Sequence, residues 1–366
     1  MTTKKRKKIA GRILLALFAA LLLLVLITFI THRVKTNREL TLLQEKGYCN
    51  PVSVGDYSLN VVKFGNESGG HTIVALAGLG MGDCSVSMRQ MSASLEENNL
   101  VVFVDRAGYG LSGDTNHEMT LEYIVDDYRR ALKNAGIEAP YILMPHSIGG
   151  AYATYWCSQY PEEIEAVVFV DGTQLNVTVR EEDMDEYQIS WFDHVLAGLA
   201  KLGFGRYVLR DSFYHYPDNY SEDDQYLGDV LSLMTIDSIA TLSECNLTPE
   251  NIQKAFDTIV TNDVPKLYIC ASWGYETAED FAEYIQWMNR QRQINNLGAP
   301  VENPDREAVN TLLQQSESMR QTILVPYIEK MGNCELVCLG GDHMIYEQKP
   351  IECGKIIKDF IDSLDG

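Results

Sequence analysis

Hydrophobic and polar residues follow two kinds of pattern along this chain. Short apolar runs are typical of strands buried on both faces of a parallel sheet, whereas apolar residues spaced three and four apart are typical of helices. Apolar runs predict strands over residues 72–77, 100–104, 141–144, 166–170, 266–271 and 335–339, and an alternating pattern predicts one over 57–64. Helices are predicted over 85–97, 120–135, 151–160 and 351–364. This alternation predicts a mostly parallel sheet with right-handed crossovers and helices on both faces.

Two stretches interrupt the alternation. Residues 173–263 are rich in aromatic and acidic side chains and have helical spacing without a buried-strand run, which predicts a helical cap inserted between strands. Residues 278–330 also have helical spacing, which predicts a second long helical segment between strands. The segment Asn66–Gly70, which follows the first long strand, predicts a hairpin turn because it is rich in Asn, Ser and Gly.

The N-terminal region predicts a membrane anchor. Ile13 to Ile30 is apolar except for Thr28, and eighteen helical residues reach about 27 Å, close to the hydrocarbon thickness of a bilayer. A basic cluster, Lys4–Lys8, precedes this run, which favours a cytoplasmic N-terminus and a body outside the cytoplasm. A cleavable signal peptide is the alternative, but the run is long and no small-x-small cleavage site follows it, so we favour an uncleaved anchor.

A strand, a sharp turn and a helix meet at Pro145-His146-Ser147-Ile148-Gly149-Gly150. This context predicts a nucleophile elbow, in which a serine at a strained turn exposes its hydroxyl beside the N–H groups of the next helix. Pro145 replaces the glycine that usually begins the motif. The alternative interpretation is an ordinary strand-to-helix turn with a capping serine.

Composition excludes several classes of function. The 366 residues carry a net charge of −21, and the first 38 residues hold nine basic side chains and no acidic one, so the body is strongly acidic. An acidic surface repels phosphate backbones, and a nucleic-acid partner is not expected. The eight cysteines are too few for a disulfide scaffold and show no zinc-like spacing, and they are either reduced or partly paired.

Five motifs in order resemble the α/β-hydrolase fold family over roughly residues 50–364. They are the loop Ala77-Gly78-Leu79-Gly80, the segment Asp105–Ser112, the elbow His146–Gly150, the dipeptide Tyr160-Pro161 and the late loop Gly341-Asp342-His343. The resemblance implies an α/β-hydrolase fold, with a mostly parallel central sheet, helices on both faces and a helical cap, preceded by one N-terminal transmembrane helix. The implied division is a cytoplasmic tail and anchor (1–35), a juxtamembrane linker (36–50), a core (51–172 and 264–364) and a cap (173–263).

The resemblance also implies a serine nucleophile, Ser147, activated by His343, which follows the last predicted strand. Two carboxylates are candidates for the third member. Asp171 lies at the end of the strand after the nucleophile strand, and Glu276 lies in the loop after the next one. We favour Asp171 because of its strand-end position. The backbone N–H groups of Leu79 and Ile148 are the expected oxyanion hole. We interpret His146 as a packing or hydrogen-bonding residue.

Such a site predicts hydrolysis of a carboxylic ester or a related acyl bond through an acyl-enzyme, with a small-molecule acyl substrate and no cofactor or metal. A serine at position 147 disfavours the dehalogenase and dienelactone-type chemistries, which use Asp or Cys there. The alternatives are an amidase or peptidase and a non-catalytic ligand-binding protein on the same scaffold. The cap aromatic and methionine side chains predict either an apolar acyl pocket or a simple cap core: Met184, Tyr187, Trp191, Phe192, Phe213 and Tyr214.

Overall fold

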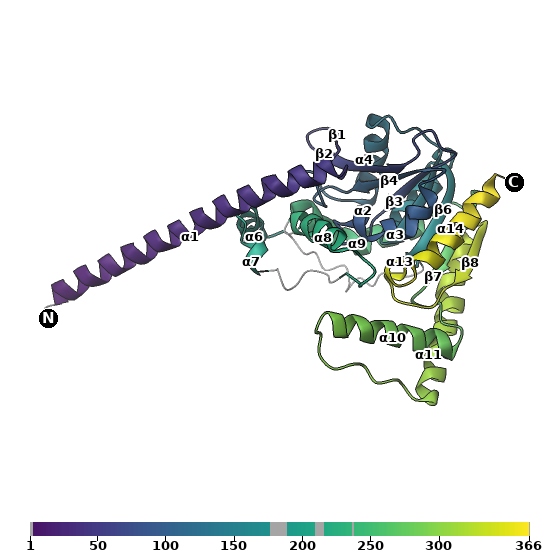
Figure 1. The fold of residues 1–366 in the computed structure, drawn as a ribbon. Coiled ribbons are helices and arrows are strands. Elements are labelled where there is room, and N and C mark those ends of the chain that lie inside the picture. The colour runs from purple at the N-terminus through teal and green to yellow at the C-terminus, as the bar shows by residue number, and fades with distance from the viewer. Residues whose placement is uncertain (1–2, 176–188, 209–215, 236–237, 366) are drawn as a thin grey trace.

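The computed structural model describes residues 3–175, 189–208, 216–235 and 238–365. Its strands are β1 (Pro51–Ser53), β2 (Ser58–Gly65), β3 (Thr72–Leu76), β4 (Leu100–Asp105), β5 (Tyr141–Ser147), β6 (Ile164–Gly172), β7 (Lys266–Cys270) and β8 (Cys334–Cys338). In this described part they form an eight-stranded sheet in the order β1-β2-β4-β3-β5-β6-β7-β8 (Figure 1). From β4 to β8 all neighbours are parallel, as predicted, whereas β1 and β2 are antiparallel to their neighbours.

The predicted hairpin at Asn66–Gly70 is wrong. Strand β2 pairs with β4 rather than with β3, which follows it along the chain. Strand β4 lies between β2 and β3 and pairs with both. All six of its residues are buried, as expected for an interior strand. Gly69 still closes a turn on Asn66 (N–H to carbonyl, 2.9 Å), but the turn passes the end of β4.

Helices cover both faces of the sheet. They are α2 (Cys84–Ser87), α3 (Arg89–Ser92), α4 (Leu121–Asn134), α5 (Gly149–Gln159), α6 (Trp191–Lys201), α7 (Gly205–Val208), α8 (Glu222–Thr235), α9 (Ile239–Asp257), α10 (Ala278–Ile294), α11 (Arg306–Met319), α12 (Val325–Met331), α13 (Ile345–Gln348) and α14 (Pro350–Leu364), with short turns η1 (Ala93–Leu95) and η2 (Pro161–Glu163) and a π-helical turn η5 (Arg320–Leu324). The single predicted helix over 85–97 is broken into α2, α3 and η1.

Two hydrophobic clusters form the core, one on each face of the sheet. Alternate residues of β4 divide between them, because side chains of a strand point to opposite faces: Val102 and Val104 join α4 and α5, whereas Val101 and Phe103 join α3 and α14. Helix, sheet and helix thus form three layers, and the loops at the carboxyl ends of the parallel strands lie along one side of the sheet. All eight cysteines lie in the described residues and are free thiols.

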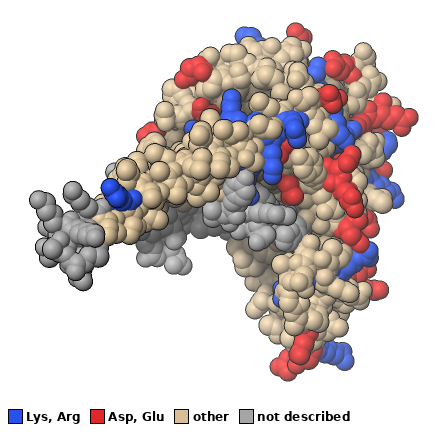
Figure 2. Space-filling view, turned by 60° about the vertical axis from the view of Figure 1, so that its left-hand side comes forward, with Lys and Arg blue, Asp and Glu red and all other residues tan. Residues whose placement is uncertain are grey.

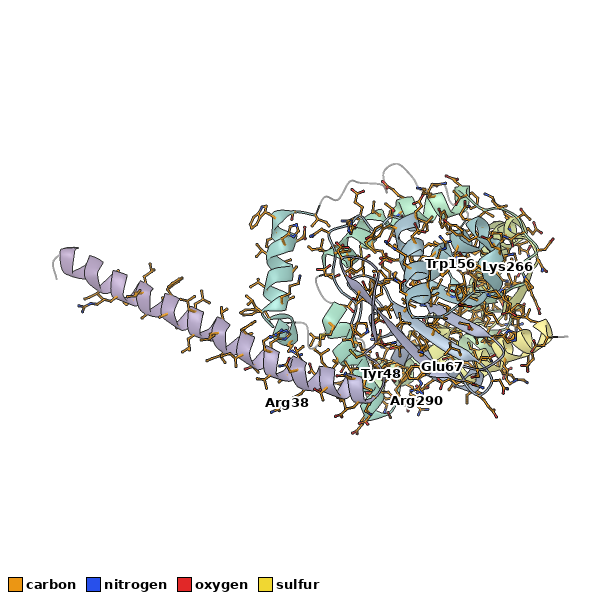
Figure 3. All side chains as sticks on the ribbon, turned by 90° about the horizontal axis from the view of Figure 1, so that it is seen from above. Arg38, Tyr48, Glu67, Trp156, Lys266 and Arg290 are labelled. Atoms are coloured by element: carbon orange, nitrogen blue, oxygen red, sulfur yellow. The ribbon has the colours of Figure 1, made fainter. Side chains whose placement is uncertain are left out.

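The first helix, α1 (Thr3–Glu45), is the only one in the described residues that is long and apolar enough to cross a membrane. Its mean hydropathy over the best window is 3.2, and only 6% of that window is buried. The helix projects from the body as a long rod (Figures 1 and 2). Residues 36–45, part of the predicted juxtamembrane linker, continue α1 without a break until the chain turns into the body near Tyr48 (Figure 3).

Candidate active site

The predicted nucleophile lies at a strained turn. Strand β5 ends at Ser147, whose φ is 53°, a left-handed conformation that non-glycine residues rarely adopt. Helix α5 begins two residues later at Gly149, and Ile148 occupies its N-cap position. The Ser147 carbonyl accepts a hydrogen bond from Thr173 N–H at 2.8 Å, which joins the turn to the end of β6. Strand, strained serine and helix are thus arranged as in a nucleophile elbow.

Two glycines let the neighbouring loops approach this turn. A Cβ on Gly78 would lie 3.2 Å from Ser147 Cβ and 3.0 Å from His146 Nδ1, and a Cβ on Gly149 would lie 2.4 Å from the Leu76 carbonyl oxygen. Any larger residue at either place would push the loop after β3 away from the serine. The predicted oxyanion donors, Leu79 and Ile148, are therefore on two segments that adjoin Ser147.

His343 is bonded to Asp171. Its Nδ1 lies 2.7 Å from Asp171 Oδ2, and the side chain of His343 is 47% exposed whereas that of Asp171 is 1% exposed. A carboxylate only accepts, so Nδ1 carries the proton and Nε2 is left as the basic nitrogen when the ring is neutral. The ring also lies beside His146, with 4.6 Å between ring centroids, and His146 directly precedes Ser147.

The buried carboxylate of Asp171 is held by the end of strand β7. Its Oδ1 accepts from the N–H groups of Ala271 (2.8 Å) and Ser272 (3.1 Å), and its Oδ2 also accepts from Ser272 Oγ at 2.6 Å. The backbone φ of Asp171 is 43°, a second left-handed residue at the sheet edge. These three donors fix the orientation of the carboxylate toward the imidazole of His343.

Glu276 lies elsewhere. Its side chain is exposed in the loop before α10, and its backbone N–H donates to Asp280 Oδ2 at 3.0 Å. Of the two carboxylates that the sequence left open, the structure thus brings Asp171, and not Glu276, into contact with His343.

His146 is buried and bonded to the backbone of the histidine loop. Its Nε2 lies 3.1 Å from the His343 carbonyl oxygen, and its Nδ1 lies 3.3 Å from Met81 Sδ. Because a carbonyl only accepts, Nε2 carries the ring proton. His146 therefore ties the loop after β8 to the strand that ends in Ser147, which agrees with its interpretation as a hydrogen-bonding residue.

Burial and charge separate the two histidines. Burial would by itself lower the pKa of His343, but the hydrogen bond and negative charge of Asp171, with the charge of Asp342, raise that pKa above its ordinary value. Burial, followed by the nearby His343, lowers the pKa of His146 to about 3. His146 therefore stays neutral across the physiological range, and His343 is the member of the pair that titrates there.

A buried ion pair holds the loop that carries Leu79, and sequence reasoning did not find it. Arg106 donates from Nη1 to the Ala77 carbonyl (2.7 Å) and from Nη2 to the Gly78 carbonyl (2.8 Å). Its partner is Glu244 of α9, with Arg106 Nη2 and Glu244 Oε1 3.0 Å apart and side chains that are 2% and 0% exposed. Glu244 also accepts from Tyr152 Oη at 2.5 Å. Arg106 thus fixes the carbonyl groups of this loop, while the N–H groups of Gly78 and Gly80 donate to Met81 Sδ (3.2 Å) and Tyr109 Oη (3.2 Å).

The motif Asp105–Ser112 contained a signal for half of this pair, because an arginine directly after a buried strand must find a partner. The position of Glu244, 138 residues away in the cap, gave no such signal.

The described residues contain no group of three His, Cys, Asp or Glu side chains placed to hold a metal ion. The absence of a cofactor stays a prediction.

The predicted acyl pocket is not formed by the part of its lining that the structure describes. Trp191 and Phe192 are 76% and 52% exposed on α6, so neither lines a pocket nor fills a cap core. The other four predicted lining residues lie outside the described residues: Met184, Tyr187, Phe213 and Tyr214.

Comparison with known proteins agrees with this architecture. Residues 72–215 match the family model described as alpha/beta hydrolase fold. The chain is 35% identical over 200 residues to "Uncharacterized protein YbdG" of Bacillus subtilis (strain 168), over 54% of this chain and 59% of that protein. It is 39% identical over 89 residues to "Putative methylesterase 14, chloroplastic" of Arabidopsis thaliana, over 24% of this chain and 26% of that protein. The matches thus span less than two thirds of either relative.

Among solved structures, the haloalkane dehalogenase DbeA-M1 loop variant from Bradyrhizobium elkanii superposes with a TM-score of 0.52 at 14% identity, over 86% of this chain and 96% of that one. At that identity the likeness shows the fold alone. Family model, sheet order and superposition agree: the chain has the α/β-hydrolase fold.

Proposed function

We propose that the protein is a serine hydrolase that cleaves a carboxylic ester or a related acyl bond. The observation that carries this proposal is the contact of His343 Nδ1 with the buried Asp171 carboxylate, on a loop that adjoins the strained turn at Ser147. A carboxylate, an imidazole and a serine in this order are the parts that nucleophilic acyl transfer requires. The methylesterase among the relatives is named for chemistry of this class.

The mechanism follows from the roles of these groups. The neutral His343 takes the proton of Ser147 Oγ as this oxygen attacks the acyl carbon, and the N–H groups of Leu79 and Ile148 stabilise the oxyanion. The tetrahedral intermediate collapses, the bond to the leaving group breaks, and the leaving group departs with the proton from His343. Water then attacks the acyl-serine, again with His343 as base, and releases the carboxylic acid and free Ser147.

A fluorophosphonate probe tests the proposal directly. Full-length protein in detergent micelles is incubated with the probe, digested and mapped by mass spectrometry, and the expected adduct is on Ser147. The His343→Ala variant serves as control, and we expect it to fold and to lose labelling because the serine lacks its base. A folded wild-type protein without an adduct, or with an adduct on a different serine, would favour the ligand-binding alternative.

The pH dependence of labelling should report His343. The reactive form is the neutral imidazole, and its pKa is raised, so the labelling rate should fall as pH decreases through a midpoint above the ordinary histidine value of about 6.5. In Asp171→Asn the burial of the ring remains and its negative partner is gone, so the midpoint should move to lower pH. A midpoint unchanged between the two proteins would contradict the assignment. The measurement is the rate of probe incorporation from pH 5 to 9.

We also propose that α1 anchors the protein in a membrane, with its N-terminus in the cytoplasm and the body outside. The supports are the long apolar run of α1 and the basic cluster that precedes this run near the N-terminus. Cys245 is exposed on α9 and offers a reporter. A membrane-impermeant maleimide added to intact cells should label the wild type more strongly than a Cys245→Ser variant. If the difference between the two appears only after permeabilisation, the orientation is the reverse.

A further inference from the structure

Helix α6 carries its apolar side chains on the outside. Its buried residues are Asp193 and Ala197, one turn apart, whereas five large apolar residues are exposed to between 37% and 76%: Trp191, Phe192, Val195, Leu196 and Leu199. Asp193 forms a capping box with Ser190 at the start of the helix, so its burial results from capping rather than from a hydrophobic contact. An amphipathic helix that turns this much apolar surface to water needs a partner that covers it.

The segment that follows α6 is fastened to α1. Gly203 lies so close to His32 that a Cβ would be 2.4 Å from His32 Cβ. Arg206 of α7 donates from Nε to His32 Nδ1 (2.9 Å) and from Nη2 to Thr36 Oγ1 (3.0 Å), and it pairs with Glu39. The side chains of Arg206 and Glu39 are 10% and 6% exposed, so this junction is buried rather than superficial.

This junction lies at the end of the apolar run of α1. His32 is two residues beyond Ile30, which places it about 3 Å past the run along the helix axis. Basic residues typical of a headgroup layer follow at once, Arg33 and Lys35. In Figures 1 and 3, α6 lies crosswise to α1, on the side of the body that faces the N-terminal end of that helix. A bilayer spanned by α1 would therefore meet α6 at its surface.

We propose that α6 lies in the surface layer of the membrane that α1 spans, with its apolar side chains from Trp191 to Leu199 among the lipid acyl chains. This inference rests on the proposed anchoring role of α1. The partner is lipid rather than a protein because α6 is fixed beside the membrane-spanning helix at the height of the headgroups. Trp191, the first residue of α6, suits that layer, since an indole places its polar N–H beside headgroups and its apolar part below them.

Tryptophan fluorescence can measure this contact. Full-length protein is reconstituted into phosphatidylcholine vesicles with or without bromine atoms on the acyl chains, which quench nearby indoles. We expect strong quenching in the wild type and a loss of most of the quenched signal in Trp191→Phe. The matched control is Trp287→Phe, on α10, which lies away from α1 in Figure 1 and should leave the quenched signal unchanged.

Flotation of the same vesicles separates the two proposals. Protein that floats with the vesicles but shows equal quenching in the wild type and Trp191→Phe would overturn the placement of α6 and leave the anchor intact. Protein that does not float would overturn both. A further variant, Val195→Asp, places a charge on the exposed face, where it should not disturb folding. It should float as the wild type does and lose at least half of the Trp191 quenching, and unchanged quenching would contradict the proposal.

Discussion

Replacing Asp171 with Asn should reduce the rate of acyl-enzyme formation by about 10⁴-fold, as expected when an amide replaces the carboxylate that orients a catalytic imidazole. The carboxylate accepts a hydrogen bond from His343 Nδ1–H and would stabilise the positive charge that the ring gains when Ser147 is deprotonated. An Asn side chain can instead donate to Nδ1, which would place the ring proton on Nε2, the nitrogen that must act as base.

The matched control is Glu276→Gln, the other carboxylate that the sequence offered. Its side chain is exposed and the structure gives it no contact with His343, so the rate should stay within about twofold of the wild type. Both variants are compared by the rate of fluorophosphonate incorporation at Ser147, with circular dichroism as the measure of folding. A large loss in Glu276→Gln together with a small one in Asp171→Asn would reverse the assignment.

The sequence favoured Asp171 because of its strand-end position, but it left Glu276 open for a topological reason. Strands β6 and β7 are neighbours and parallel, so the loops after them open at the same edge of the sheet. Either loop can reach a histidine after β8 by that criterion. What decides is local: Asp171 adopts a positive φ, and the first N–H groups after β7 point at its carboxylate. Neither property is visible in a hydrophobic pattern.

The parts of the fold that depend on local pattern were predictable. The apolar runs mark β3 to β8 to within a few residues, and the small residues around Ser147 mark the turn. The pairing of the strands was less predictable. The order β2-β4-β3 places β4 between β2 and β3, although β3 follows β2 along the chain. The exposure of Trp191 and Phe192 was also unpredictable, since an aromatic-rich helix has the same sequence signature whether it packs in a core or faces outward.

The least predictable feature, the Arg106–Glu244 pair, gives the second large expected effect. Replacing Glu244 with Gln leaves the Arg106 guanidinium buried without a counter-charge, and the free energy of unfolding should fall by about 3–5 kcal/mol. The measurement is denaturant unfolding in detergent micelles, followed by tryptophan fluorescence. Glu122→Gln is the control, because its ion pair with Lys254 is at the surface, and its loss should cost at most about 1 kcal/mol.

The same variant separates stability from the arrangement of the site. Arg106 holds the carbonyls of Ala77 and Gly78, and a guanidinium that loses Glu244 should no longer hold this loop in one position against Ser147. At a temperature where Glu244→Gln remains folded, the labelling rate at Ser147 should therefore fall by at least tenfold, while Glu122→Gln labels like the wild type. Loss of stability with an unchanged labelling rate would mean that the pair joins the cap to the core without positioning the oxyanion donors.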